Sequence, residues 1–252
     1  MEFELWQFGV FFAAAFLGGF IDAIAGGGGL ICLPALLAMN VPPHVALATN
    51  KLQGSFGTFT AAANFWAKGY IDKKEIITGI IFTFIGACTG ALLVLFIDAK
   101  FLNYIIPFLL IGIFIYTILS PNLGKEDVQA RMSPKPFYII FGFILGFYDG
   151  FFGPGTGSFW TFALVGLLGL YMKKAVAHTK VLNFVSNFVS LIVFILGGQI
   201  LWLVGFIMAV GQILGGYFGS NFVMKKDVKW IKTIFLTIVA LTILKIIYGF
   251  IF

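Results

Sequence analysis

Two charged residue types recur at matching places in two apolar stretches of the chain. An aspartate precedes a run of glycines in GFIDAIAGGGG and again in GFYDGFFGPGTG, so that Asp22 corresponds to Asp149. A lysine follows in ALATNKL and in AVAHTKV, which pairs Lys51 with Lys180. A charged side chain at the centre of a bilayer costs about 2.5 to 3.5 kcal/mol, and it normally faces a cavity or a partner. The repeated order therefore predicts a duplicated site, in which each lysine contacts a ligand or neutralises an aspartate of its own or of the other half.

The glycine clusters that follow each aspartate are a second candidate binding element. A new helix that starts beyond such a cluster exposes unsatisfied N–H groups and the positive end of its dipole. Helix N-termini bind anions, and broken helices use them in membrane transporters. The candidate substrate-binding residues are Gly26, Gly27, Gly28, Gly29, Gly153, Gly155, Thr156 and Gly157. Close packing of helices against glycine is the alternative interpretation.

A band of hydrogen-bonding side chains around each lysine is the third element of the predicted site. Polar residues spaced three or four apart share one face of a helix, and in lipid that face turns toward another helix or toward water. Besides the two lysines, the substrate-binding candidates are Asn50, Gln53, Ser55, Thr58, His178, Thr179, Asn183 and Asn187. Hydrogen bonding between helices is the alternative. Asp22, Asp149 and His178 are also candidates for proton coupling, unless the aspartates only orient the glycine turns.

The composition indicates the environment in which these residues lie. Of the 252 residues, 60% are hydrophobic and only 10% charged, which leaves too little polar material to cover a soluble globule. Apolar runs of about 20 residues, long enough to cross a bilayer as helices, recur along the chain. The predicted fold class is therefore all-α, a polytopic membrane protein. The lysines and arginines behind the net charge of +6 lie mostly in short loops between apolar runs, which argues against nucleic-acid binding. Cys32 and Cys88 lack the spacing of a metal site, so we expect no metal and no cofactor.

The repeated motifs divide the chain into two halves. We expect residues 1–120 to form a first transmembrane repeat, 121–136 a cytoplasmic linker and 137–252 a second transmembrane repeat. The predicted segments are 5–24, 30–39, 44–67, 74–97 and 101–119 in the first half, and 137–152, 158–171, 173–196, 200–224 and 228–251 in the second. The segment after each glycine cluster is too short to span a bilayer alone. Each broken segment is therefore one interrupted helix, a re-entrant hairpin or two crossings.

The distribution of basic residues favours an inverted repeat over two parallel halves. Cytoplasmic loops of membrane proteins are enriched in lysine and arginine. The inverted arrangement leaves only Lys100 on one side and places twelve basic residues on the other: Lys68, Lys73, Lys74, Lys125, Arg131, Lys135, Lys173, Lys174, Lys225, Lys226, Lys229 and Lys232. Parallel halves would divide the same residues almost evenly. The inverted arrangement also predicts that both termini lie outside the cell.

The quoted motifs, together with LPALLAMNVPPHVALATNKLQGSFGT and KAVAHTKVLNFVSN, resemble those of the TauE/SafE sulfite exporter family, in particular its YfcA-like branch. The resemblance covers nearly the whole chain. It implies a permease of the bacterial inner membrane, with substrates among sulfite, sulfonates and other organosulfur anions.

The prediction from the residues and the resemblance together is a transporter that moves a small anion by alternating access. A passive anion channel with the same site is the closest alternative. We do not expect an enzyme, because the Gly-x-Gly-Asp signature of intramembrane aspartyl proteases is absent. The expected partners are the lipid bilayer and the anion, with no nucleic acid, and formation of a homo-oligomer is left open.

Overall fold

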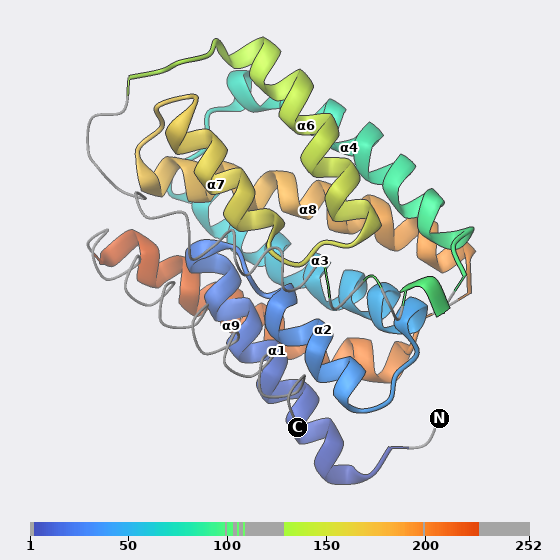
Figure 1. The fold of residues 1–252 in the computed structure, drawn as a ribbon. Coiled ribbons are helices and arrows are strands. Elements are labelled where there is room, and N and C mark those ends of the chain that lie inside the picture. Colours follow the sequence, from blue (N-terminus) through green and yellow to red (C-terminus); the bar gives the residue numbers. More distant parts are fainter. Residues whose placement is uncertain are drawn as a thin grey trace.

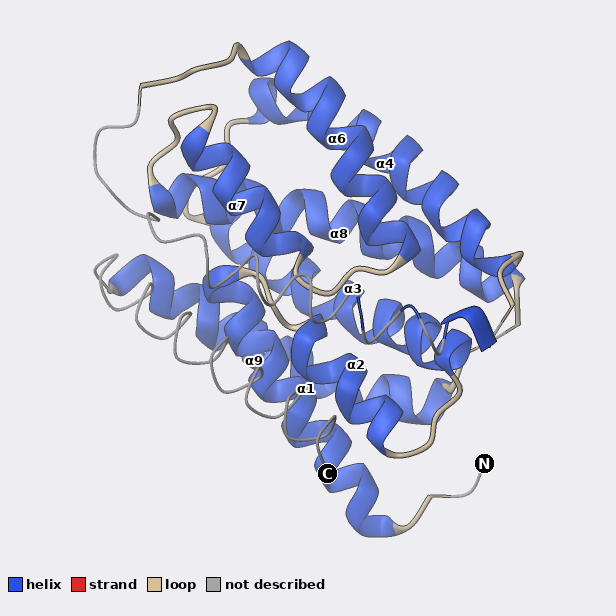
Figure 2. Ribbon diagram, viewed as in Figure 1, coloured by secondary structure: helices blue, strands red, loops and turns tan. Residues whose placement is uncertain are grey.

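The computed structural model describes residues 3–98, 100–102, 105, 108, 129–198 and 200–226, and within these ranges the chain is helical without any strand. The predicted segment 228–251, the linker residues 121–128 and most of segment 101–119 lie outside the described residues. The first half contributes α1 (Leu5–Ala25), α2 (Gly29–Ala38), α3 (Pro43–Ala67) and α4 (Lys73–Leu95). The second half contributes α6 (Pro134–Phe151), α7 (Thr156–Gly166), α8 (Met172–Leu196) and α9 (Trp202–Lys225). The prediction of an all-α fold is confirmed (Figure 2).

Local signals determine where most of these helices begin and end. Proline occupies the first turn of both α3 and α6, where its fixed φ suits a helix start, so α6 begins at Pro134 within the expected linker. The side chain of Asp72 caps α4 by accepting from the backbone N–H groups of Lys74 and Glu75. The helix α7 ends at Gly166, earlier than predicted, because Gly169 adopts a φ of 68° and lets Leu170 N–H bond back to Leu164 O.

The two halves exchange one helix with each other. Helix α4 of the first half packs along α6 of the second, and α9 of the second half packs along α1 of the first (Figure 1). The pair α1–α2 forms one hairpin and α6–α7 another, and the open ends of these hairpins face opposite ends of the molecule. Helices α3 and α8 pack against each other in the middle. Corresponding helices of the two halves thus make corresponding contacts.

Glycines allow the exchanged helices to approach closely. On α4, a Cβ atom at Gly86 would lie 2.7 Å from Phe147 N of α6, and closer still to Phe143 O. On α9, a Cβ atom at Gly215 would lie 2.6 Å from Phe20 N of α1. Small residues at helix interfaces are the usual means of close packing in a bilayer, where lipid removes the hydrophobic driving force between helices. Close packing therefore explains these helical glycines, which differ from those of the two clusters.

Apolar residues form two buried cores, one toward each end of the molecule. One core surrounds Tyr138 and Trp160, and the other surrounds Phe11 and Leu33. Large apolar side chains also cover the outside of α1, α4, α6 and α9. Of the described helices, α1, α4, α8 and α9 are long and apolar enough to cross a membrane. This arrangement leaves a polar zone between the cores, at the level of the glycine clusters.

The close packing of α4 on α6 predicts the effect of one added methyl group. We expect Gly86→Ala to destabilise the protein by about 1 to 3 kcal/mol, because the backbone of α6 blocks the new Cβ atom. Thermal unfolding of the purified protein in detergent measures this change. Gly9→Ala is the matched control, since no atom lies within 4 Å of a Cβ atom there and alanine favours the helix. Equal unfolding temperatures for the two variants would contradict the packing described here.

Candidate functional site

The two glycine clusters form sharp turns at which the hairpins reverse. After α1, Gly26 adopts a φ of 75°, and α2 starts at Gly29. After α6, Gly153 and Gly155 adopt φ values of 103° and 84°, and α7 starts at Thr156. These left-handed conformations are accessible to glycine and strained for other residues. The predicted breaks are thus real, and in both halves the structure has the form of a hairpin.

The two turns touch each other near the centre of the molecule. A Cβ atom at Gly157 would lie 2.5 Å from Gly26 Cα, and one at Gly29 would lie 3.1 Å from Pro154 Cα. The hydroxyl of Ser158 donates a hydrogen bond of 2.5 Å to Gly26 O. Glycine is therefore required here for contact between the turns as well as for their conformation.

Two buried ion pairs connect the halves reciprocally. Lys51 Nζ lies 2.7 Å from Asp149 Oδ1, and Lys180 Nζ lies 2.9 Å from Asp22 Oδ2. Each ammonium group also donates to the backbone carbonyl of the same aspartate. Both aspartates lie in the last turn of their helices, where the helix dipole favours a cation, so each lysine stabilises the end of the helix whose aspartate it neutralises. Of the pairings left open by the sequence, the structure thus has each lysine bound to the aspartate of the other half.

The surroundings of the two aspartates differ, although their positions correspond. Asp149 Oδ2 accepts a hydrogen bond from Ser186, and its side chain is only 4% exposed. Asp22 Oδ1 accepts from Gly28 N–H at 3.3 Å, and its side chain is 16% exposed. The residue that corresponds to Ser186 in the first half is Gly57, and the space beside Gly57 is filled by the amide of Gln212. Asp22 is therefore held less tightly than Asp149.

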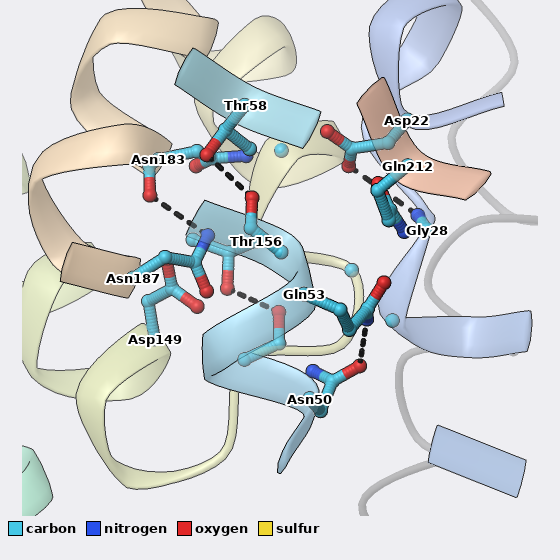
Figure 3. A pocket seen from close by; sticks show the side chains of 15 residues that line it. Asp22, Gly28, Asn50, Gln53, Thr58, Asp149, Thr156, Asn183, Asn187 and Gln212 are labelled. Atoms are coloured by element: carbon cyan, nitrogen blue, oxygen red, sulfur yellow. Dashed lines mark hydrogen bonds between the residues drawn. The ribbon is translucent and has the colours of Figure 1, made fainter. Parts of the chain in front are cut away.

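A polar cavity lies between the two turns and helices α3, α8 and α9 (Figure 3). The space in which the centre of a water molecule fits amounts to about 30 Å³, enough for a small ion or molecule. Both aspartates contribute to the wall. The complete lining is Asp22, Gly28, Gly29, Asn50, Gln53, Gly54, Thr58, Asp149, Gly153, Gly155, Thr156, Gly157, Asn183, Asn187 and Gln212.

Most of the residues singled out in the sequence therefore meet at this cavity. The remaining candidates are in contact with other parts of the protein. Gly26 is in contact with the opposite turn, and Ser55 donates to Lys51 O within α3. The hydroxyl of Thr179 pairs with that of Thr161 at 3.2 Å. Gly27, Lys51, Ser55, His178, Thr179 and Lys180 are buried near the cavity without lining it.

His178 has a positioning role that the sequence alone did not indicate. Its Nε2 atom accepts a hydrogen bond of 3.2 Å from the backbone N–H of Asp72, the residue that precedes α4. Since Nε2 accepts, the ring proton lies on Nδ1 and is donated to Tyr138 Oη, 2.9 Å away. At the corresponding position Thr49 Oγ1 accepts from Leu201 N–H, which precedes α9, at 3.1 Å. The two residues therefore attach the exchanged helices α4 and α9 to α8 and α3.

Two residues of the cavity wall were not predicted from the sequence. Gly54 corresponds to Asn183 of the other half, and a Cβ atom there would lie 3.4 Å from Asn187 Oδ1. Gln212 is the one strongly polar residue in WLVGFIMAVGQILGGY, and an amide within a membrane helix needs a partner or a cavity. Its Nε2 atom lies 3.4 Å from Cys32 Sγ, beside the turn of the first half. The isolation of Gln212 in that apolar run was thus an available signal.

A buried polar cavity between two hairpins, beside helices such as α1, α8 and α9 that are long and apolar enough to cross a membrane, is typical of a membrane transport protein. The chain belongs to the sulfite exporter TauE/SafE family, whose family model matches residues 11–246. The match confirms the family that the motifs resemble. Similar proteins in bacteria are named as probable membrane transporters. No solved structure matches the chain at a significant level.

Similar proteins extend over nearly the full length of the chain. The "Probable membrane transporter protein YfcA" of Escherichia coli strain K12 is 46% identical over 240 residues, which cover 95% of this chain and 89% of the relative. A "Probable membrane transporter protein" of Haemophilus influenzae is 44% identical over 243 residues, 95% of this chain and 94% of the relative. A more distant protein, the "Probable membrane transporter protein YunE" of Bacillus subtilis, is 26% identical over 266 residues.

The reciprocal ion pairs predict a strong energetic coupling between the halves. Replacing Lys51 by Met, or Asp149 by Leu, leaves a buried charge without its partner, and we expect each change to destabilise the protein by about 3 to 5 kcal/mol. The double variant contains neither charge, and it should recover most of that loss. Thermal unfolding of the wild type, both single variants and the double variant in detergent measures the coupling.

The pair Lys174–Glu75 is the matched control for this cycle. Its atoms are 3.2 Å apart, but the side chains are 22% and 36% exposed. Exposed pairs contribute about 0 to 1 kcal/mol, so the corresponding cycle should show little coupling. Additive effects of Lys51→Met and Asp149→Leu on the free energy of unfolding would contradict the predicted coupling between these two charges.

Proposed function

We propose that this protein is a secondary transporter of the bacterial inner membrane that moves a small anion by alternating access. The observation that carries the proposal is the convergence of two helix N-termini, those of α2 and α7, on one buried cavity between the two halves. Gly29 and Gly157 lie in the first turns of these helices and line the cavity. Backbone N–H groups and the positive ends of two helix dipoles therefore face the same small space, an arrangement that favours an anion.

The two ion pairs suit such a site because they leave the cavity close to neutral. Each buried carboxylate is already balanced by a lysine, so the dipoles of α2 and α7 are not cancelled by free negative charge. An anion in the cavity lies beside Asp22 and Asp149, and its charge alters the balance between each aspartate and its lysine. Because these pairs join the halves, a change in them alters the contact between the halves, which is the coupling that alternating access requires.

The family suggests the kind of anion. Its description names a sulfite exporter, and the relatives are named membrane transporters without a stated substrate. Sulfite and sulfonates are compact oxyanions whose several acceptor oxygens match the N–H groups of Gly29 and Gly157 and the amide groups of the wall. We therefore propose sulfite, a sulfonate or another small organosulfur anion as the substrate.

The orientation in the membrane is part of the proposal. The opposite directions of the two hairpins and their corresponding contacts support an inverted repeat. The excess of basic residues in the loops around Lys68, Arg131 and Lys173 supports a cytoplasmic location for these loops. With this orientation the N-terminus and Lys100 lie outside. Three members of the basic set, Lys125, Lys229 and Lys232, are outside the described residues.

Cysteine labelling in intact cells tests the orientation. In a Cys32→Ala, Cys88→Ala background, we expect Lys100→Cys to react with a membrane-impermeant maleimide and Lys68→Cys to react only after the cells are opened. Both lysines are exposed, so accessibility within the fold does not limit the reaction. Labelling of Lys68→Cys in intact cells would overturn the proposed topology.

Transport by proteoliposomes tests the function. We expect uptake or efflux of at least one anion among sulfite, sulfoacetate, taurine and thiosulfate, and at least about tenfold slower transport in Lys51→Ala and Lys180→Ala, which lose a charge-assisted contact. Lys174→Ala is the surface control and should transport as the wild type does. Stimulation of uptake by the same anion on the opposite side is expected of a carrier and not of a passive channel. Unchanged transport in both lysine variants would exclude the site proposed here.

A further inference from the structure

The cavity wall contains hydrogen-bond acceptors that the protein itself leaves unfilled. We propose that the anion bound here carries a hydrogen-bond donor of its own, and this inference rests on the proposed function. The ligand class is a small oxyanion with an O–H or N–H group, such as a protonated oxyanion or an amino-substituted sulfonate. This chemistry is narrower than that of oxyanions in general, and it follows from the balance of donors and acceptors around the cavity.

Two buried amide oxygens are the main observation. Gln53 Oε1 and Asn183 Oδ1 have no hydrogen-bond partner among the described residues, and the two residues are only 1% and 4% exposed. Both line the cavity, on α3 and α8 respectively, and both side chains lie at its wall in Figure 3. The large majority of buried polar atoms in folded proteins have a partner. These two oxygens are therefore positioned to accept hydrogen bonds from whatever fills the cavity.

Two threonine hydroxyls increase the excess of acceptors. Thr58 Oγ1 donates its proton to Gly54 O at 2.7 Å, and Thr156 Oγ1 donates to Gly153 O at 2.6 Å. Each hydroxyl has a single proton, so both present only lone pairs to the cavity that they line. A ligand with acceptor oxygens alone would leave the threonine and amide oxygens unfilled.

The opposite wall of the cavity disfavours a simple cation as the ligand. Gly29 and Gly157 lie in the first turns of α2 and α7, where N–H groups and the positive dipole ends are found. Lys51 and Lys180 already balance the two aspartates. The site therefore combines an anion-binding end with an acceptor-rich wall, and a ligand with both an anionic oxygen and a donor satisfies both.

A pair of ligands with the same shape and charge tests the proposal. Sulfamate and methanesulfonate are both tetrahedral monoanions at neutral pH, and they differ in an NH2 group in place of a CH3 group. We expect sulfamate to bind the purified full-length protein in detergent roughly tenfold more tightly, because an unfilled buried acceptor reduces affinity by about 5- to 150-fold. Isothermal titration calorimetry measures both dissociation constants.

Variants locate the preference on the amide oxygens. Asn183→Leu and, independently, Gln53→Met remove one acceptor each at similar volume, and each should reduce the ratio of the two affinities, sulfamate over methanesulfonate, to about threefold or less, whatever the change in the affinity for methanesulfonate itself. Two variants are used so that a folding defect in one, seen by thermal unfolding, leaves the other. Thr60→Val is the control. It lies on α3 outside the cavity lining and, like Thr58, donates to the carbonyl one turn earlier.

Each outcome has a definite meaning for the inference. Equal or tighter binding of methanesulfonate by the wild type overturns it while leaving an anion transporter in place. A preference for sulfamate that persists in both Asn183→Leu and Gln53→Met also overturns it. Binding that requires sodium and ignores the difference between the two anions would assign the amide oxygens to a cation instead. Failure of every tested anion to bind overturns the proposed function, and this inference with it.

Discussion

The neutralisation of four charges across the interface between the halves, three of them buried and Asp22 half-buried, is the constraint on which the structure depends. Lys51 and Lys180 are essentially unexposed, and the aspartates that neutralise them belong to the opposite halves. An unpaired charge in this position is strongly destabilising, so the two hairpins must bring Asp22 and Asp149 to the lysines of the central helices. The turns that follow the aspartates then come into contact, and only glycine fits at Gly26 and Gly157. The charge pairing thus brings the two turns together, and their contact requires glycine and sets the position of the cavity between them.

The sequence predicted the elements well because their signals are local. Apolar runs, proline at helix starts and glycine clusters located the described helices to within a few residues, apart from the early end of α7. Duplication identified Asp22, Asp149, Lys51 and Lys180 as a set. It left open which aspartate each lysine contacts, because that choice depends on how the hairpins of one half lie against the central helix of the other, and no short-range pattern records this.

The individual site residues were harder to predict for a related reason. A polar side chain in an apolar helix looks the same whether it faces a ligand, caps a neighbouring helix or bonds to its own backbone. His178 accepts from the residue before α4, Ser55 bonds within α3, and Asn183 lines the cavity, yet all three appeared as equivalent candidates. Gln212 was missed because it belongs to a helix without a repeated motif, and only the tertiary structure brings it to the turn of the first half.

The two turns differ in how their aspartates are held. Ser186 and Gly57 occupy corresponding positions, and the hydroxyl that fixes Asp149 has no counterpart beside Asp22. The amide of Gln212 fills that space and reaches Cys32 instead. A ligand in the cavity therefore meets one rigid carboxylate and one that is held by a longer contact, so the pseudo-symmetry of the fold does not extend to the chemistry of the site.

The exchange of helices between the halves also has a consequence for synthesis in the cell. Lys51 precedes its carboxylate partner by 98 residues, and Asp22 precedes its lysine by 158. At ribosomal speeds of about 5 to 20 residues per second, Lys51 emerges roughly 5 to 20 s before Asp149 exists. During that interval the first half has neither its counter-charge nor the helix that covers α4. The first half is therefore left with unpaired charges until α6 supplies Asp149 and α8 supplies Lys180, so the two halves are obligate partners in assembly.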